Sequence, residues 1–123
     1  MPAVKWLPAP EPHDYDAAEN YLSLLMPFSD ALIWRRNLEQ HGQAVHYAAK
    51  DILRASVLAL LPHDNKHVVR DLAKVKCGEA LSPILLVRGD LGAHPLVVAD
   101  GYHRVCASYW IDENTAIPCV ITV

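Results

Sequence analysis

Five consecutive residues, Asp100-Gly101-Tyr102-His103-Arg104, place a carboxylate, an imidazole and a guanidinium beside a glycine. Gly101 permits a positive φ angle and lets a ligand approach the backbone closely. If a helix begins directly after Gly101, its first N–H groups lack intrahelical partners and its dipole favours an anion. Arg104 would add a bidentate fork for phosphate, and His103 would hydrogen-bond the same anion or carry a proton near neutral pH. The pattern therefore predicts a turn that holds a phosphate-bearing ligand.

Asp100 is the acidic member of this turn and widens the chemistry it can do. A carboxylate beside a phosphate can act as a magnesium ligand or as a general base, so Asp100 and His103 are the candidate catalytic residues. A structural interpretation stays open, in which Asp100 caps the helix, Gly101 eases the turn and Arg104 pairs with a surface acid. The local pattern alone gives the two interpretations equal weight.

The elements around the turn follow from the apolar pattern of the last third of the chain. Strands are predicted over Ile84–Arg88 and Leu96–Ala99, with GDLGAH as the connecting turn, and a helix from about Tyr102 to Trp110. Open α/β sheets usually bind ligands where a strand ends and the next helix begins. The segment AIPCVITV predicts a terminal strand, in which Pro118 suits the start or an edge position.

The first two thirds of the chain are predicted to be mainly helical, with a Pro-rich start over residues 1–13 that is extended and tied down by Trp6 and Leu7. Residues 44–50 alternate in a way that suits a short strand, although their alanines also permit a helix, and the apolar run 51–62 is expected to be buried. Three helices are predicted: from a cap at Asp14 or Asp16 to about Met26, from Ser29 or Asp30 to Gln40 with Gly42 after its end, and from His63 or Asp64 to about Gly78.

The composition is that of a single globular domain of 123 residues, with 52% hydrophobic residues and a net charge of −3. A net negative charge disfavours binding to a nucleic-acid backbone, because such binding needs clustered Lys and Arg side chains. Three cysteines without a CxxC spacing favour a reduced protein, and no signal peptide or membrane-length apolar run is evident. We therefore expect a cytoplasmic location, with no membrane partner.

The order of these motifs resembles the ParB/sulfiredoxin-like superfamily over about residues 44–123. The matching letters are the turn 100–104 with Ala107, followed by the strand Ile117–Val120, and SPILLVRG stands as the strand before the motif. The resemblance implies an α/β (α+β) fold, a small mixed sheet with packed helices, preceded by an N-terminal helical pair in residues 1–43. It also implies nucleotide binding, with Gly101, His103 and Arg104 at the phosphates, and Mg²⁺ accompanying an ATP- or CTP-type nucleotide.

The same resemblance separates the chemistries that the superfamily performs. Sulfiredoxins carry a cysteine directly before the His-Arg pair, where this chain has Tyr102, so sulfinic-acid reduction by that route is not expected. Related free-serine kinases share a DGHxR-like turn, which keeps phosphoryl transfer or hydrolysis open. A DNA clamp of the ParB kind requires a helix-turn-helix domain downstream and is not expected here.

Residues outside the turn are further candidates for the ligand site. Tyr102 within the turn and Lys66 outside it are candidate ligand-binding residues, Lys66 because the resembling fold brings its helix near the pocket. Arg54 and Ser56 could also line the pocket, with an ion pair or simple solvation as the alternative for their segment. His63 and His67 have a spacing that can bind metal on a helix, but two ligands do not make a site, so no metal site is predicted.

Two further functions stay open besides binding of a small phosphate-bearing ligand. The first is a noncatalytic, dimeric interaction or regulatory module, consistent with surplus apolar residues in the first two helices and the cluster Trp34-Arg35-Arg36. The second is a DNA-associated, ParB-like nuclease accessory, which the acidic charge disfavours.

Overall fold

The computed structural model describes residues 1–123 and has mixed α/β architecture, which confirms the predicted α+β fold class. In chain order the elements are β1 (Lys5–Trp6), α1 (Pro12–Leu22), α2 (Phe28–His41), β2 (Gln43–Ala48), α3 (Ala49–Ser56), α4 (Lys66–Lys76), β3 (Ala80–Leu81), β4 (Ile84–Val87), β5 (Val97–Asp100), α5 (Tyr102–Ile111) and β6 (Ala116–Ile121).

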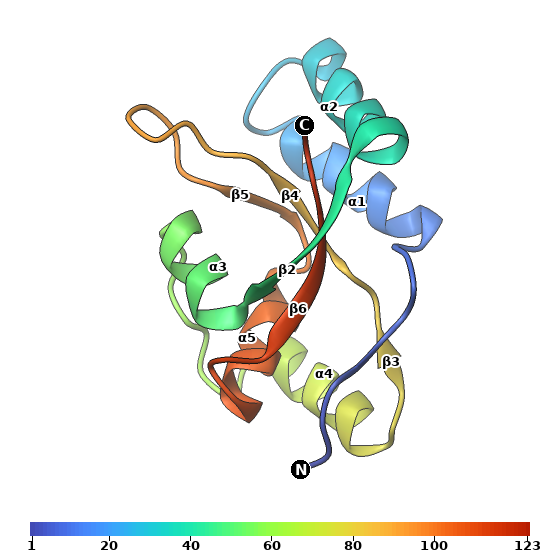
Figure 1. The fold of residues 1–123 in the computed structure, drawn as a ribbon, viewed down its shortest axis with the longest axis vertical. Coiled ribbons are helices and arrows are strands. Elements are labelled where there is room, and N and C mark those ends of the chain that lie inside the picture. The colour runs from blue at the N-terminus through green and yellow to red at the C-terminus, as the bar shows by residue number, and fades with distance from the viewer.

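A four-stranded mixed sheet in the order β2-β6-β4-β5 organises the molecule. β2 and β5 form the edges, each antiparallel to its neighbour, and the two central strands β6 and β4 are parallel. A second, two-stranded sheet joins β1 to β3, so the N-terminal strand pairs with a segment far along the chain. The connection between β4 and β5 projects from the body of the protein (Figure 1).

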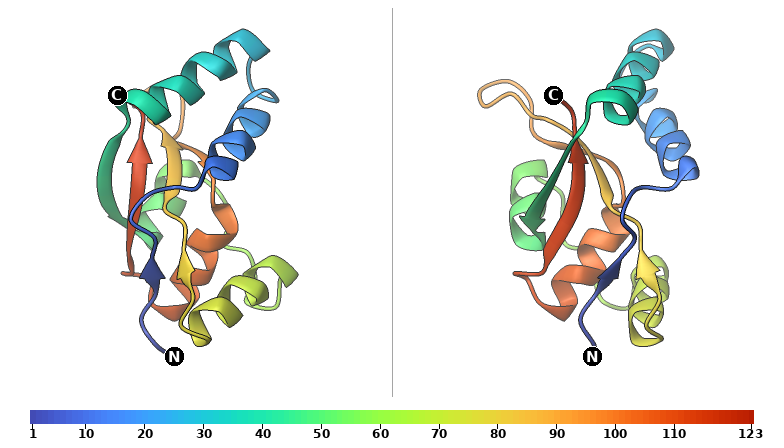
Figure 2. Two further views of the ribbon diagram at one scale, coloured as in Figure 1. Left: turned by 90° about the vertical axis from the view of Figure 1, so that its right-hand side faces the viewer. Right: turned by 45° about the vertical axis from the view of Figure 1, so that its right-hand side comes forward.

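Helices cover both faces of the four-stranded sheet. In the right-hand view of Figure 2, α1 and α2 lie on one side of the strands and α3 lies on the other. The side chains of β4 alternate between the two faces: Ile84 and Leu86 join the core with α3, α4 and α5, whereas Leu85 and Val87 join the core with α1 and α2. Burial on both faces explains why β4 is a continuous apolar run.

The predicted N-terminal helical pair is present, but its first helix begins and ends earlier than expected. Neither predicted cap, Asp14 or Asp16, is correct, because Glu11 is the N-cap and α1 begins at Pro12. Asp14 lies in the first turn, where its carboxylate accepts a hydrogen bond of 2.9 Å from the backbone N–H of Glu11. The helix ends at Leu22 rather than Met26.

The middle of the chain settles two open assignments. Residues 44–50 contain both predicted alternatives, since β2 runs to Ala48 and α3 starts at Ala49. The third predicted helix is α4, which starts later than expected, because Asn65 rather than Asp64 is its cap. The side chain of Asn65 accepts hydrogen bonds from the backbone N–H groups of His67 and Val68, at 3.0 and 3.3 Å.

Pro118 lies inside β6, which is a central strand, so the prediction of an edge or starting position was wrong. The strand tolerates a residue without an N–H group because its parallel pairing with β4 begins only at Cys119. At Pro118 the sole paired neighbour is β2, in which His46 is the partner.

None of the five helices combines the length and the apolar composition needed for a membrane span.

Candidate functional site

The turn predicted to do chemistry lies where β5 ends at Asp100 and α5 begins at Tyr102. Gly101 between them has φ 106° and ψ 19°, a left-handed conformation that glycine adopts readily. A Cβ atom at this position would overlap Cδ1 of Ile84 and lie 3.0 Å from Nη2 of Arg104. The backbone conformation and the close packing therefore both require glycine.

The start of α5 leaves backbone donors free, as the sequence predicted. The first α5 residue whose N–H group finds a backbone acceptor is Val105, which donates to the carbonyl of Gly101 at 3.0 Å. The N–H groups of Tyr102, His103 and Arg104 precede it and have no intrahelical partner. They carry the positive end of the helix dipole.

A cavity of about 350 Å³ opens beside this turn and is lined by Asp100, Gly101, His103 and Arg104. Its other walls come from the N-terminal end of α1, from α4 and from the segment 80–82. These walls carry further charge, in the side chains of Glu11, His13, Asp14, Arg70, Asp71 and Lys74. The cavity is thus rich in both acids and bases.

Arg104 is held inside the turn. Its Nη2 atom donates to Oδ2 of Asp100 at 2.9 Å and to the carbonyl of Pro83 at 3.2 Å. Both charged side chains of the pair are largely buried, at 18% and 16% exposure. The Nε atom is buried without any partner, so the protein's own atoms do not satisfy the whole guanidinium.

Asp100 lies beside a second buried carboxylate. Burial is the main cause that raises the pKa of Asp100; the guanidinium of Arg104 opposes the rise and the carboxyl group of Asp14 adds to it. Asp14 itself is only 2% exposed. Two carboxyl groups at one wall of a cavity favour a shared proton or a bound cation.

His103 faces the imidazole of His67 on α4, with ring centroids 4.6 Å apart. Burial and the neighbouring His67 lower the pKa of His103, and the carboxylate of Asp71 partly opposes them. His103 is therefore neutral at pH 7 and able to accept a proton, as a general base must.

The remaining predicted ligand residues do not share this cavity. The hydroxyl of Tyr102 donates to the carbonyl of Ala59, and Lys66 is exposed at the start of α4. Ser56 is buried, and its hydroxyl donates to the carbonyl of Leu53. Arg54 is fully on the surface, where it pairs with the carboxylate of Asp51 at 3.4 Å.

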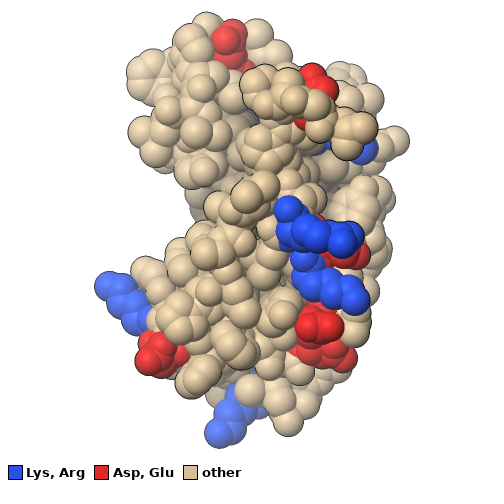
Figure 3. All heavy atoms as spheres, turned by 90° about the vertical axis from the view of Figure 1, so that its left-hand side faces the viewer, with Lys and Arg blue, Asp and Glu red and all other residues tan.

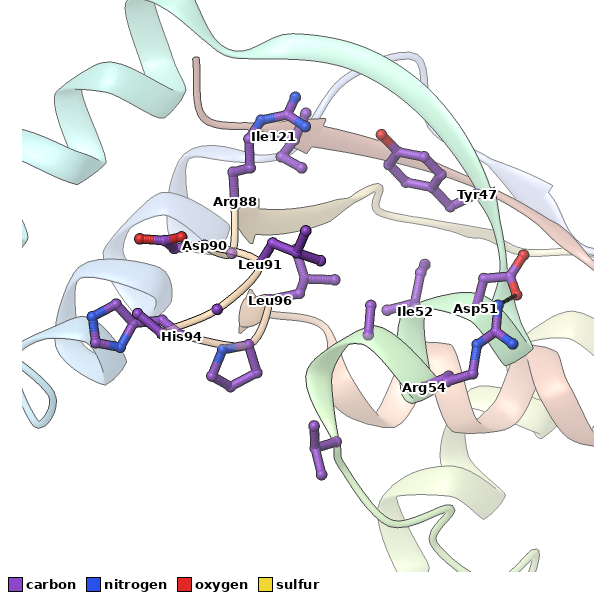
Figure 4. Close-up of a pocket in the computed structure, with 16 residues that line it drawn as sticks. Tyr47, Asp51, Ile52, Arg54, Arg88, Asp90, Leu91, His94, Leu96 and Ile121 are labelled. Atoms are coloured by element: carbon purple, nitrogen blue, oxygen red, sulfur yellow. Dashed lines mark hydrogen bonds and ion pairs between the residues drawn. The ribbon is translucent and has the colours of Figure 1, made fainter.

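Arg54 lines a larger, more apolar groove of about 850 Å³ between α3 and the connection from β4 to β5. In Figure 3 this face of the molecule is hollowed between an upper and a lower lobe, and the largest group of charged atoms lies to the right of the hollow. Figure 4 shows Tyr47 and Ile121 on one side of the groove and Ile52 and Arg54 on another. No predicted catalytic residue reaches this groove.

The two histidines with metal-ligand spacing pack against different residues. His63 precedes α4 and packs edge-on against Trp110, with centroids 5.5 Å apart, whereas His67 packs against His103. The aromatic-basic cluster is likewise engaged within the protein, since Arg35 binds the carboxylates of Asp16 and Glu39 at 2.6 and 2.8 Å.

The acidic and basic residues on the other walls of the cavity were not predicted from the sequence. Arg70, Asp71 and Lys74 have the spacing of neighbours on one helix face, and this was a readable signal. Glu11 and Asp14 reach the turn only through tertiary contacts, such as the hydrogen bond of 2.8 Å from Ser82 to Glu11, which no local pattern announces.

Comparisons with protein-family models, with curated proteins and with solved structures find no match to this chain.

Proposed function

We propose that the protein binds a nucleotide or another phosphate-bearing ligand in the cavity at the Asp100–Arg104 turn. The observation that carries the proposal is the meeting of the free N–H groups of α5 with the side chains of Arg70 and Lys74 at one cavity. Helix N-termini and cationic side chains are the two protein features that most directly favour phosphate. The resemblance of the turn to the ParB/sulfiredoxin-like motif supports the same ligand class.

The size and charge of the cavity narrow the ligand. A volume of about 350 Å³ lies at the small end of ligand pockets, so it suits the phosphate part of a nucleotide better than the whole molecule. Acidic side chains on the same walls disfavour a bare anion. We therefore expect phosphate to enter with Mg²⁺, as ATP- or CTP-type nucleotides do, beside the carboxylate of Asp100.

A phosphoryl-transfer or hydrolytic reaction would use the two catalytic candidates differently. His103 is neutral and lines the cavity, so it is the proton acceptor of choice. Asp100 is hydrogen-bonded to Arg104 and would orient that guanidinium. The free state of all three cysteines is consistent with a cytoplasmic setting for this activity.

A specific observation favours the noncatalytic, dimeric module as the second candidate. Large apolar side chains on and between α1 and α2 are exposed, among them Leu24 at 80%, Phe28 at 82% and Ile33 at 61%. Large apolar side chains that are exposed close together in the sequence are candidates for a protein interface. Sedimentation across a concentration series would reveal a dimer, and Phe28→Asp would abolish it.

Thermal-shift titration with ATP, ADP, CTP and GTP, each with and without Mg²⁺, tests the ligand proposal. Saturation at about 100 times the dissociation constant stabilises the native state by about 2.7 kcal/mol. We expect the shift to be lost in the double variant Arg70→Ala, Lys74→Ala and kept in Lys76→Ala, since Lys76 is exposed on the same helix but does not line the cavity. Absence of any shift at millimolar nucleotide, or equal shifts in all three proteins, contradicts the proposal.

A further inference from the structure

The N-terminal end of α1 gathers three side chains with metal-binding atoms. One ligand atom each from Glu11, His13 and Asp14 lies within 4.8 Å of the other two. Nε2 of His13 is 3.5 Å from Oδ1 of Asp14, and Oε1 of Glu11 accepts a hydrogen bond from the hydroxyl of Ser82. All three residues line the cavity at the Asp100–Arg104 turn.

Helix capping accounts for only part of this arrangement. Oδ2 of Asp14 accepts from the backbone N–H of Glu11, as a capping box requires. The other oxygen, Oδ1, lies 3.5 Å from Nε2 of His13, and the Asp14 carboxyl group also lies beside that of Asp100. His13 is 70% exposed and contributes nothing to the cap, so capping does not explain its position over a buried carboxylate.

A separate observation in the same cavity points to a missing cation. Asp71 on α4 is only 6% exposed and lines the cavity, yet its carboxylate makes no hydrogen bond and no ion pair. Asp14 is 2% exposed and lies against Asp100, whose single cationic partner is Arg104. The cavity is lined by four carboxyl groups, of Glu11, Asp14, Asp71 and Asp100, and by three cationic groups, of Arg70, Lys74 and Arg104, so a bound cation would balance the excess of acidic groups.

We propose that Glu11, His13 and Asp14 bind a divalent transition-metal ion of the Zn²⁺ or Mn²⁺ type at the edge of the cavity. One imidazole nitrogen with two carboxylate oxygens is a donor set for these ions, whereas Mg²⁺ and Ca²⁺ prefer oxygen alone. The exposed His13 can turn to close the ligand distances. Three protein ligands leave at least one coordination position open toward the cavity, where a water molecule or a phosphate oxygen can bind.

This site stands apart from the proposed nucleotide function, because the protein alone supplies the ligands. Its residues belong to the N-terminal 43 residues, outside the segment that resembles the ParB/sulfiredoxin-like superfamily. If both sites operate, the metal lies beside the phosphates; if only one does, the other is unaffected.

The test is calorimetric titration of the full-length, EDTA-treated protein with Zn²⁺ and with Mn²⁺, in buffer free of nucleotide and phosphate. We expect one equivalent to bind, with an affinity lowered about ten-fold or more in His13→Ala and in Asp14→Asn. His41→Ala is the matched control, because His41 is an exposed histidine outside the cavity, and it should bind as the wild type does.

His13→Ala changes an exposed side chain, so loss of folding does not confuse its result, and circular dichroism verifies the fold of Asp14→Asn. No binding by the wild type at millimolar metal overturns the proposal, as does equal binding by wild type and His13→Ala. Failure of metal binding together with a positive nucleotide titration removes this site and leaves the proposed function standing. Metal binding together with a negative nucleotide titration supports this metal site and removes the proposed nucleotide function.

Discussion

Replacing Gly101 by alanine tests whether the turn is built as the structure describes. The left-handed φ of 106° is strained for any residue with a Cβ, at about 1–3 kcal/mol. The added methyl group also overlaps Cδ1 of Ile84, a fully buried side chain in the core, and such overpacking costs about 1–3 kcal/mol. Together these give a destabilisation of about 2–6 kcal/mol.

For a chain of this length the loss corresponds to a fall in Tm of roughly 8–24 °C. Gly92→Ala is the matched control, because a Cβ there meets no atom within 4 Å and the backbone has no positive φ. We expect that control to change stability by less than about 0.5 kcal/mol. Urea and thermal unfolding of the two variants measure the difference, and a loss below about 1 kcal/mol in Gly101→Ala would refute the reasoning.

Three further predictions concern the helix cap and the thiols. Asn65→Ala removes the acceptor for two backbone N–H groups of α4 and should cost about 1 kcal/mol in urea unfolding; an unchanged midpoint contradicts the cap. Burial raises the pKa of the Cys119 thiol from 9.0 to about 12 in the native state. Since the thiol ionises at lower pH in the unfolded state than in the native state, the free energy of unfolding falls as pH rises from 9 to 12. At pH 10 the loss is about 1.4 kcal/mol relative to pH 8, and Cys119→Ala should lose less stability over that interval than the wild type. Ellman's reagent should label Cys77 in the native protein and reach Cys106 and Cys119 only after unfolding; labelling of all three in the native state would contradict their burial.

The sequence predicts the region around the turn well because its signals are local. The apolar run Ile84–Val87 specifies β4, and Gly101 after Asp100 specifies the turn from which α5 begins. The predicted junction between β5 and α5 is confirmed, because it too is specified by local signals. Errors at helix ends are of one to five residues; the smallest include the one at Asn65, beside the predicted cap Asp64.

What the sequence misses depends on tertiary pairing. Pro118 occupies a central strand because β4 begins to pair one residue later, and this register cannot be read from the segment itself. The acidic wall at Glu11 and Asp14 reaches the turn across a large part of the chain. The sequence allowed Arg54 to line the pocket at the turn, yet α3 carries its side chain to the larger groove.

We propose that the N–H groups at the start of α5 bind phosphate. Two-dimensional amide NMR of the labelled protein during titration with ATP and CTP, each with Mg²⁺, tests this proposal at those groups. We expect saturable shifts centred on the N–H signals of Tyr102, His103 and Arg104, with the signal of Gly92 in the larger groove unchanged. Shifts confined to that groove, or no saturable shift at millimolar nucleotide, would contradict it.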